Sequence, residues 1–354
     1  MTDSVFLSVE QLEQTLKAGS VTSDAEMARQ LSGMQLTERL SNTKAAALRS
    51  GLKGKKSREA LAALADRSVF RAPPASDILS DPPAEQHTQE LMLSRTVQYV
   101  QKTLPKIPDF IADRLTISYE QVQLEPGQTW KTATGDQSLH IVQTAKSTVM
   151  FRDGKEVSNG EKVKRSTLEA ITLQTVGIFG PILAIALVGA TAPQSDITWS
   201  YWEKGLRGPD AVFRYHARPQ KPLFAVGAES LSEDGKIVPF QMNVPFHGEL
   251  AIDPQSGAIL RLTMQADFQP RMPLDESDVM VEYGPVAIGG NTYVCPLKSV
   301  SISRQRHILG LHEWGLDFNV YAPFESLLND TAFSNYHLFH STVRMLPEYT
   351  PAPN

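Results

Sequence analysis

The stretch that decides the fold is GELAIDPQSGAILRLTMQADF, residues 248–268. Over 258–268 apolar side chains occupy every second position, and mostly polar ones lie between them. A period of two predicts an antiparallel strand with one apolar and one polar face. Leu250 and Ile252 show the same alternation, and 253–257, DPQSG, is typical of a turn. The stretch is therefore predicted to be a β-hairpin.

The alternation continues in VEYGPVAIGGNTYVCPLKSVSIS, residues 281–303. The Gly-Gly-Asn segment at 289–291 separates two runs rich in Val, Ile and Tyr, which is typical of two strands joined by a tight turn. Patterns of the same period recur between residues 115 and 346 and indicate about ten antiparallel strands. So many strands in a meander must curl into a barrel or into an open half-barrel.

Two regions precede the strands. Residues 1–72 carry short amphipathic patterns, and Ser8 with Gln11 has the spacing of a capping box, which predicts a small helical bundle. Residues 73–85 are rich in proline without periodicity and are predicted to be a linker. Residues 86–354 form the second domain. The predicted fold class is α+β, a helical bundle followed by a strongly curved antiparallel half-barrel with helices on its concave side.

The composition excludes several classes of function. A formal net charge of -5 over 354 residues gives no electrostatic reason to expect a nucleic-acid partner. Cys295 is the only cysteine, so neither an intramolecular disulfide nor a thiolate zinc site can form. Its position in a predicted strand indicates an inert buried thiol.

No pattern of catalytic residues is found. His337 and His340 stand three positions apart on a predicted strand, so their side chains point to opposite faces and cannot share a metal. No serine lies in a nucleophile elbow, and no glycine-rich loop has the spacing that cradles a phosphate. The sequence therefore predicts a protein that is not an enzyme and uses no cofactor. Trp199 and Trp202 are predicted to be sheet residues, with a carbohydrate platform as the alternative.

An uncharged segment runs from 171 to 195 and contains VGIFGPILAIALVGA at 176–190. It is long enough for a membrane span, but glycines and Pro181 interrupt it. A short buried helix that begins at Pro181 is a second interpretation. The third is an apolar helix that lines or covers a ligand cavity. We do not expect the chain to span a membrane.

The second domain resembles a known family. Its opening helix, its meander, the apolar helix between strands and the phrases at 248–262 and 281–296 resemble the outer-membrane lipoprotein carrier (LolA/LolB-like) superfamily, over about 84–346. The resemblance implies an open half-barrel whose concave apolar face, lidded by helices, holds acyl chains. This chain is longer than those carriers and offers no arginine that matches an acyl-contacting one. It is also similar in layout to other bacterial cell-envelope proteins.

From this resemblance we expect a non-enzymatic envelope protein that binds a lipid, a lipoprotein acyl chain or another apolar ligand. The contacts expected are Phe179, Ile182, Leu183, Ala186 and Leu187 from the apolar helix, and Leu260, Leu262 and Met264 from the sheet. The expected location is periplasmic or secreted, although the first ten residues lack a signal peptide and the low cysteine usage fits the cytoplasm as well. One alternative is a protein-interaction or sensor module that binds a partner through its N-terminal helices. Another is a hydrolase or sugar-binding protein that uses Trp199 and Trp202.

Overall fold

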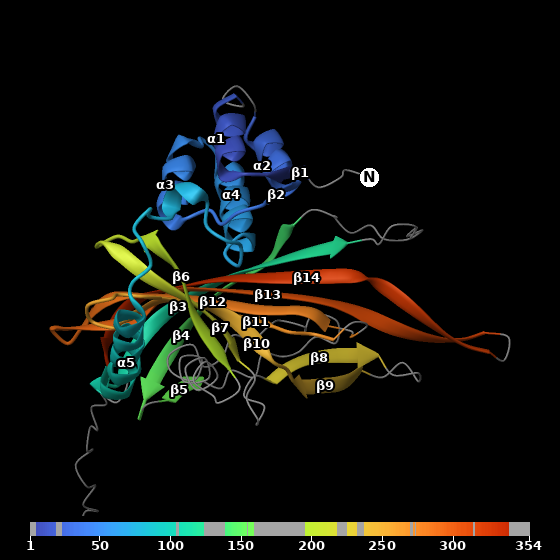
Figure 1. Ribbon diagram of the computed structural model, residues 1–354. Helices are drawn as coiled ribbons and strands as arrows, with labels where there is room; N and C mark the ends of the chain where they lie inside the picture. Colours follow the sequence, from blue (N-terminus) through green and yellow to red (C-terminus); the bar gives the residue numbers. More distant parts are fainter. Residues whose placement is uncertain are drawn as a thin grey trace, which may run out of the picture.

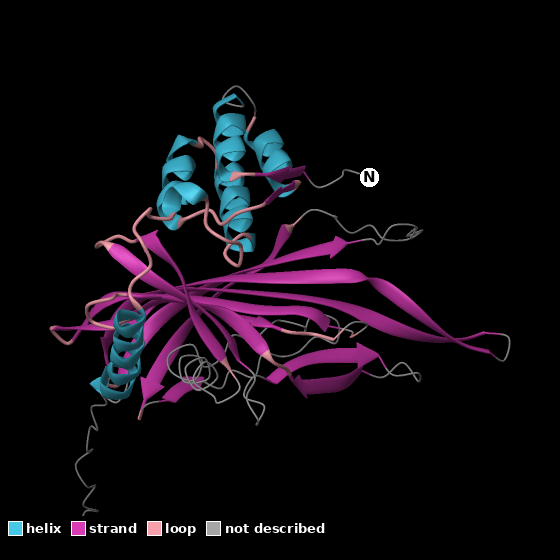
Figure 2. Cartoon of the chain, viewed as in Figure 1, coloured by secondary structure: helices cyan, strands magenta, loops and turns pink. Residues whose placement is uncertain are grey.

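The computed structural model describes residues 5–18, 23–103, 106–123, 139–153, 155–158, 195–217, 225–231, 237–269, 272, 274–313 and 316–339. Over these residues the chain has an α+β fold, in which helices lead and a large antiparallel sheet follows (Figures 1 and 2). The predicted fold class is confirmed at this level.

The N-terminal part contains four helices and a short parallel strand pair. The helices are α1 (Val9–Ala18), α2 (Asp24–Ser32), α3 (Asn42–Gly51) and α4 (Lys55–Arg67), and the strands are β1 (Val5–Leu7) and β2 (Met34–Leu36). The predicted capping box is confirmed, because Ser8 Oγ accepts from the Gln11 N–H at 3.2 Å and Gln11 Oε1 accepts from the Ser8 N–H at 2.8 Å. Leu12, Leu31 and Leu61 pack into a core that these helices share.

Ten strands form the main sheet, in the order β5-β4-β3-β14-β13-β12-β11-β10-β7-β6, and all neighbours are antiparallel. The strands are β3 (Phe110–Gln123), β4 (His140–Arg152), β5 (Lys155–Ser158), β6 (Asp196–Lys204), β7 (Pro209–Ala217), β10 (Phe246–Ile252), β11 (Ile259–Ala266), β12 (Leu274–Ile288), β13 (Asn291–Glu313) and β14 (Leu316–Leu338). A separate antiparallel pair consists of β8 (Ala225–Leu231) and β9 (Ile237–Asn243). Within the described residues β5 and β6 are the two ends of the sheet, so the sheet is open.

The strand order departs from a simple meander. Strands β10 to β14 lie side by side in the order in which they occur in the chain. Beyond β10 the next strand is β7, and beyond β14 the next strand is β3, which pairs with β14 along its length. This ladder runs from Phe110 opposite Leu338 to Gln123 opposite Phe324. The first and last strands of the sheet in the chain therefore lie side by side in its middle, a long-range pairing that local alternation does not report.

Helices lie on both faces of the sheet (Figure 1). On one face, the α5 face, Met92 and Val100 of α5 (Gln86–Thr103) join the main hydrophobic core. Helices α1 to α4 lie on the opposite face, the α4 face, where Ala63 and Val69 pack into a second core with Met280 and Val300. The sequence pattern did not indicate this second contact.

Two contacts hold α5 and the preceding segment in place. Gly257, in the turn between β10 and β11, has a φ of 75°, and a Cβ there would lie 2.6 Å from the backbone of Arg95 in α5. Only glycine combines that conformation with so close an approach. In the predicted linker, the Leu79 N–H donates to the carbonyl of Trp202 at 2.9 Å. The linker therefore runs hydrogen-bonded against β6.

Candidate functional site

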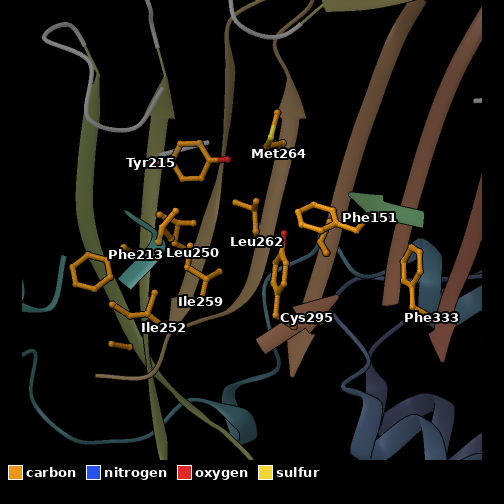
Figure 3. Packing of buried hydrophobic residues seen from close by; sticks show 14 of the residues in the cluster. Phe151, Phe213, Tyr215, Leu250, Ile252, Ile259, Leu262, Met264, Cys295 and Phe333 are labelled. Atoms are coloured by element: carbon orange, nitrogen blue, oxygen red, sulfur yellow. The ribbon is translucent and has the colours of Figure 1, made fainter. Parts of the chain in front are cut away.

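The α5 face gathers the largest apolar side chains of the sheet. They come from four neighbouring strands, β7, β10, β11 and β12, and include Phe213, Tyr215, Leu250, Ile252, Ile259, Leu262, Met264 and Val281. Figure 3 shows Phe213, Leu250, Ile252 and Ile259 together, with Tyr215, Leu262 and Met264 beside them. The predicted contacts Leu262 and Met264 therefore lie on this face and are almost fully buried.

The predicted contact Leu260 does not continue this row. Leu262 pairs with Leu250 and Ile259 pairs with Ile252, while Arg261 pairs with Ala251, so Leu260 is the extra residue of a β-bulge. The bulge brings Ile259 onto the α5 face in the place that strict alternation gives to Leu260, which is only half-buried. The expectation that Leu260 shares a register with Leu262 is thus corrected. Phe179, Ile182, Leu183, Ala186 and Leu187 lie outside the described residues, so their part in a site stays a prediction.

Toward β13 and β14 the same face becomes polar. Val281 pairs with Ser299 and Val279 with Ser301, and cross-strand partners share a face. The polar row continues through β14 to β3, where Thr331 Oγ1 and Thr116 Oγ1 lie 3.1 Å apart. We call the buried polar side chains of this row, most of which carry a hydroxyl group, the hydroxyl stripe. They are at most 8% exposed and comprise Ser118, Ser277, Ser299, Ser301, Ser303, Gln305, Asn329 and Thr331.

Several polar atoms of the hydroxyl stripe lack hydrogen bonds. Within the described part of the chain, Ser299 Oγ, Ser301 Oγ and Gln305 Nε2 have no partner, although their side chains belong to residues only 1%, 0% and 3% exposed. A buried polar group without a partner costs about 1–3 kcal/mol, and native proteins rarely leave one unpaired. Three such atoms on one face of one strand indicate that water or a ligand supplies the missing bonds.

A small cavity lies between α5 and the sheet. It has a volume of about 20 Å³, and Tyr99 and Val100 of α5 line it together with Ile259 and Tyr283 of the sheet. The Tyr283 hydroxyl is buried without a hydrogen-bond partner among the described residues, and burial raises its pKa well above the usual range. The cavity has room for one water molecule and not for an acyl chain.

The α4 face carries a buried ionic cluster that joins the N-terminal part to the sheet. Arg261 donates to both oxygens of Glu203, at 2.9 and 3.2 Å, and Arg39 from the loop before α3 forms a second ion pair with Glu203. Glu249 accepts from the Tyr201 hydroxyl at 2.9 Å and lies 3.7 Å from Arg39. Burial alone would raise the pKa of Glu203, but the two guanidinium groups hold it below its ordinary value.

A second ionic cluster forms where α4 meets β13 and β14. Lys298 Nζ lies 2.5 Å from Asp66 Oδ1 and 3.6 Å from Asp330 Oδ1. Burial, and then the neighbouring Asp330 carboxylate, raise the pKa of Asp66 to about 7 in spite of Lys298. Both clusters join side chains of the N-terminal part to side chains of the sheet, so they are suited to holding α1–α4 on the sheet.

Other candidate side chains also have structural roles. His216 and His247, both half-buried on the α4 face, share the Asp267 carboxylate, at 3.0 and 2.8 Å. Over the described ranges, no group of three or more His, Cys, Asp or Glu side chains is placed to hold a metal. The rings of Trp199 and Trp202 pack edge to face at 4.7 Å between centroids, so both are packing residues of the sheet.

Cys295 is fully buried, and burial raises the pKa of its thiol to about 12. The predicted burial of the thiol is confirmed, and its lack of reactivity stays a prediction. In the part of the chain that the structure describes, no helix combines the length and the apolar character needed to cross a membrane.

A scan against models of known protein families finds no match, and a search of curated proteins finds no similar sequence. The resemblance to the lipoprotein carriers therefore stays a prediction, and the function is argued from the α5 face itself.

Proposed function

We propose that this protein is a non-enzymatic binding protein for a lipid, an acyl chain or another apolar ligand, held on the α5 face of its sheet. In this proposal the sheet is a strongly curved, open half-barrel whose concave side is the α5 face, and α1–α4 form a small helical bundle behind it. The protein acts in the periplasm or outside the cell.

The observation that carries the proposal is the composition of the α5 face. Large apolar side chains of β7, β10 and β11 and buried polar atoms without partners share one side of one sheet. Burial of a ligand methylene contributes about 0.8 kcal/mol, so a chain of ten methylenes supplies about 8 kcal/mol before the cost of immobilising it. The apolar segment at 176–190 acts as the lid, with Phe179, Ile182, Leu183, Ala186 and Leu187 toward the ligand.

The cavity of about 20 Å³ bears on how the ligand enters. Since it holds no more than a water molecule, an acyl chain needs α5 to move away from the sheet. Met92 and Val100 of α5 are the side chains that would be displaced.

Native mass spectrometry of the full chain, purified gently from a bacterial host and followed by organic extraction, tests the proposal. We expect a bound lipid on the wild type, lost in Leu183→Glu and kept in Leu206→Glu, because Leu206 is 95% exposed. A protein that carries no lipid and takes up none when lipid is added would contradict the proposal.

One observation favours the alternative, an interaction module. Val5 and Phe6 on β1 are 53% and 59% exposed, and exposed apolar side chains beside an edge strand suit a protein partner. Phe6→Glu tests this alternative more cleanly than deletion of residues 1–72, because deletion would also uncover Met280 and Val300. Co-purification of a partner that Phe6→Glu abolishes, without any bound lipid, would support the interaction module.

A further inference from the structure

We propose that the hydroxyl stripe binds the head group of the ligand, and that this head group is uncharged and rich in hydroxyl or carbonyl oxygens, as in a glycerol ester or a glycolipid. The inference rests on the proposed function, since it places the polar end of the same ligand on the hydroxyl stripe.

The position of the stripe is the first argument. Ser299 and Ser301 are the cross-strand partners of Val281 and Val279, so the polar row begins one strand, about 5 Å, from the apolar part of the α5 face. Residues two apart on a strand are about 6.7 Å apart, so Ser299 and Ser303 span about 13 Å along β13. A ligand whose chain lies over β10 and β11 thus brings its polar end to a row of hydroxyl groups.

The missing hydrogen bonds are the second argument. A serine hydroxyl both donates and accepts, whereas Gln305 Nε2 only donates. Ser299 Oγ, Ser301 Oγ and Gln305 Nε2 are buried without partners in the described structure, so these groups can pair with ligand oxygens without first breaking a bond inside the protein. Carbonyl and hydroxyl oxygens of a head group match this set.

The charges around the stripe are the third argument. Every member of the stripe is neutral, and a buried ionised head group would need a counter-charge. On β3, the guanidinium group of Arg114 already pairs with Glu156 at 3.6 Å and with Ser147 at 3.0 Å. Toward Gln305, the described ionisable groups beside the stripe are the carboxyl groups of Glu325, opposite Gln305, and of Glu120, opposite Leu327, with the His140 imidazole opposite Glu120, so carboxyl groups outnumber the imidazole there.

The test compares two ligands with the same acyl chain on the delipidated full-length protein. We measure binding of 1-monooleoylglycerol, which has a neutral diol head, and of oleate, which is anionic. We expect tighter binding of 1-monooleoylglycerol, and a loss of about 30-fold in the double variant Ser299→Ala/Ser301→Ala, from two hydrogen bonds of about 1 kcal/mol each. Oleate binding should change little in that variant, and Ser334→Ala, an exposed serine on β14, should leave both ligands unaffected.

A thermal unfolding scan without ligand separates a ligand site from a row of bound water. If the two hydroxyl groups are unpaired in the empty protein, the double variant keeps or raises the unfolding temperature. A lowered unfolding temperature together with unchanged 1-monooleoylglycerol binding would mean that the stripe holds ordered water only, and would overturn the inference. Oleate bound as tightly as 1-monooleoylglycerol would also overturn it and leave the proposed function standing, whereas no binding of either ligand would remove the proposed function itself.

Discussion

Asp66 should make the stability of this protein depend on pH between about 4 and 7. Its side chain is buried at the contact of α4 with the sheet, and Lys298 is shared between it and Asp330. Burial and the nearby Asp330 carboxylate raise the pKa of Asp66 from the ordinary 3.8 to about 7. The folded protein therefore binds a proton at Asp66 over a pH range in which the unfolded chain releases it.

The sign and size of the effect follow from linkage. Because the folded-state pKa lies above the unfolded one, Asp66 has no effect on stability below about pH 4 and destabilises the fold progressively up to about pH 7. A tenfold change in proton affinity is worth about 1.4 kcal/mol, so the total is at most about 4 kcal/mol. In Asp66→Asn the amide oxygen can still accept from Lys298, but the group cannot ionise.

Urea unfolding of the wild type and of Asp66→Asn at pH 4, 5.5, 7 and 8 measures this. We expect the wild type to lose up to about 4 kcal/mol relative to the variant as the pH rises from 4 to 7, with no further difference at pH 8. Asp81→Asn, at an exposed position, should run parallel to the wild type throughout. Parallel curves for wild type and Asp66→Asn, or a difference that grows toward low pH, would refute the reasoning.

Two stability measurements and one labelling measurement test how side chains are buried on the α4 face and the α5 face of the sheet. Glu203→Gln leaves two buried guanidinium groups short of a counter-charge and should cost about 3–5 kcal/mol in urea unfolding, against no measurable loss for the exposed Glu85→Gln. Leu262→Ala should cost about 2–5 kcal/mol and Leu260→Ala clearly less, since only the first side chain is fully buried, and equal losses would contradict the bulge. Cys295 should resist a thiol reagent at pH 8 in the native protein and react in urea, so fast native labelling would show that it is accessible.

Local sequence rules predicted the elements that depend on a few neighbouring residues. The Ser8 capping box, helix α5 that opens the predicted second domain, and the hairpin of residues 248–268 all appear, the last as the antiparallel pair β10 and β11. Each depends on backbone geometry or capping within a few positions, which the residue types determine.

Features that depend on distant residues were missed or misplaced. At the start of α4, the N–H groups of Lys56 and Ser57 are capped by the Asp24 carboxylate from α2, at 3.1 and 2.9 Å. The pairing of β3 with β14 and the docking of α1–α4 likewise join residues more than a hundred positions apart. The hydroxyl stripe had one signal in the sequence, the alternation of Ser299, Ser301 and Ser303 with apolar residues, but only the register shows that these serines lie on the same face as Val281.

The bulge at Leu260 shows how the two faces of the sheet depend on one another. Residues two apart on a regular strand share a face, so without the bulge Ile259 and Arg261 would lie on the same side. In the structure Ile259 packs into the apolar core of the α5 face while Arg261 reaches Glu203 on the α4 face. The bulge thus lets one strand serve both the proposed ligand face and the ionic cluster. Deleting Leu260 would remove the extra residue, so Ile259 would pair with Ile252 in a regular ladder, adjacent to Arg261 and still on the opposite face. The half-buried leucine can therefore be removed from the register without moving either neighbour to the wrong side.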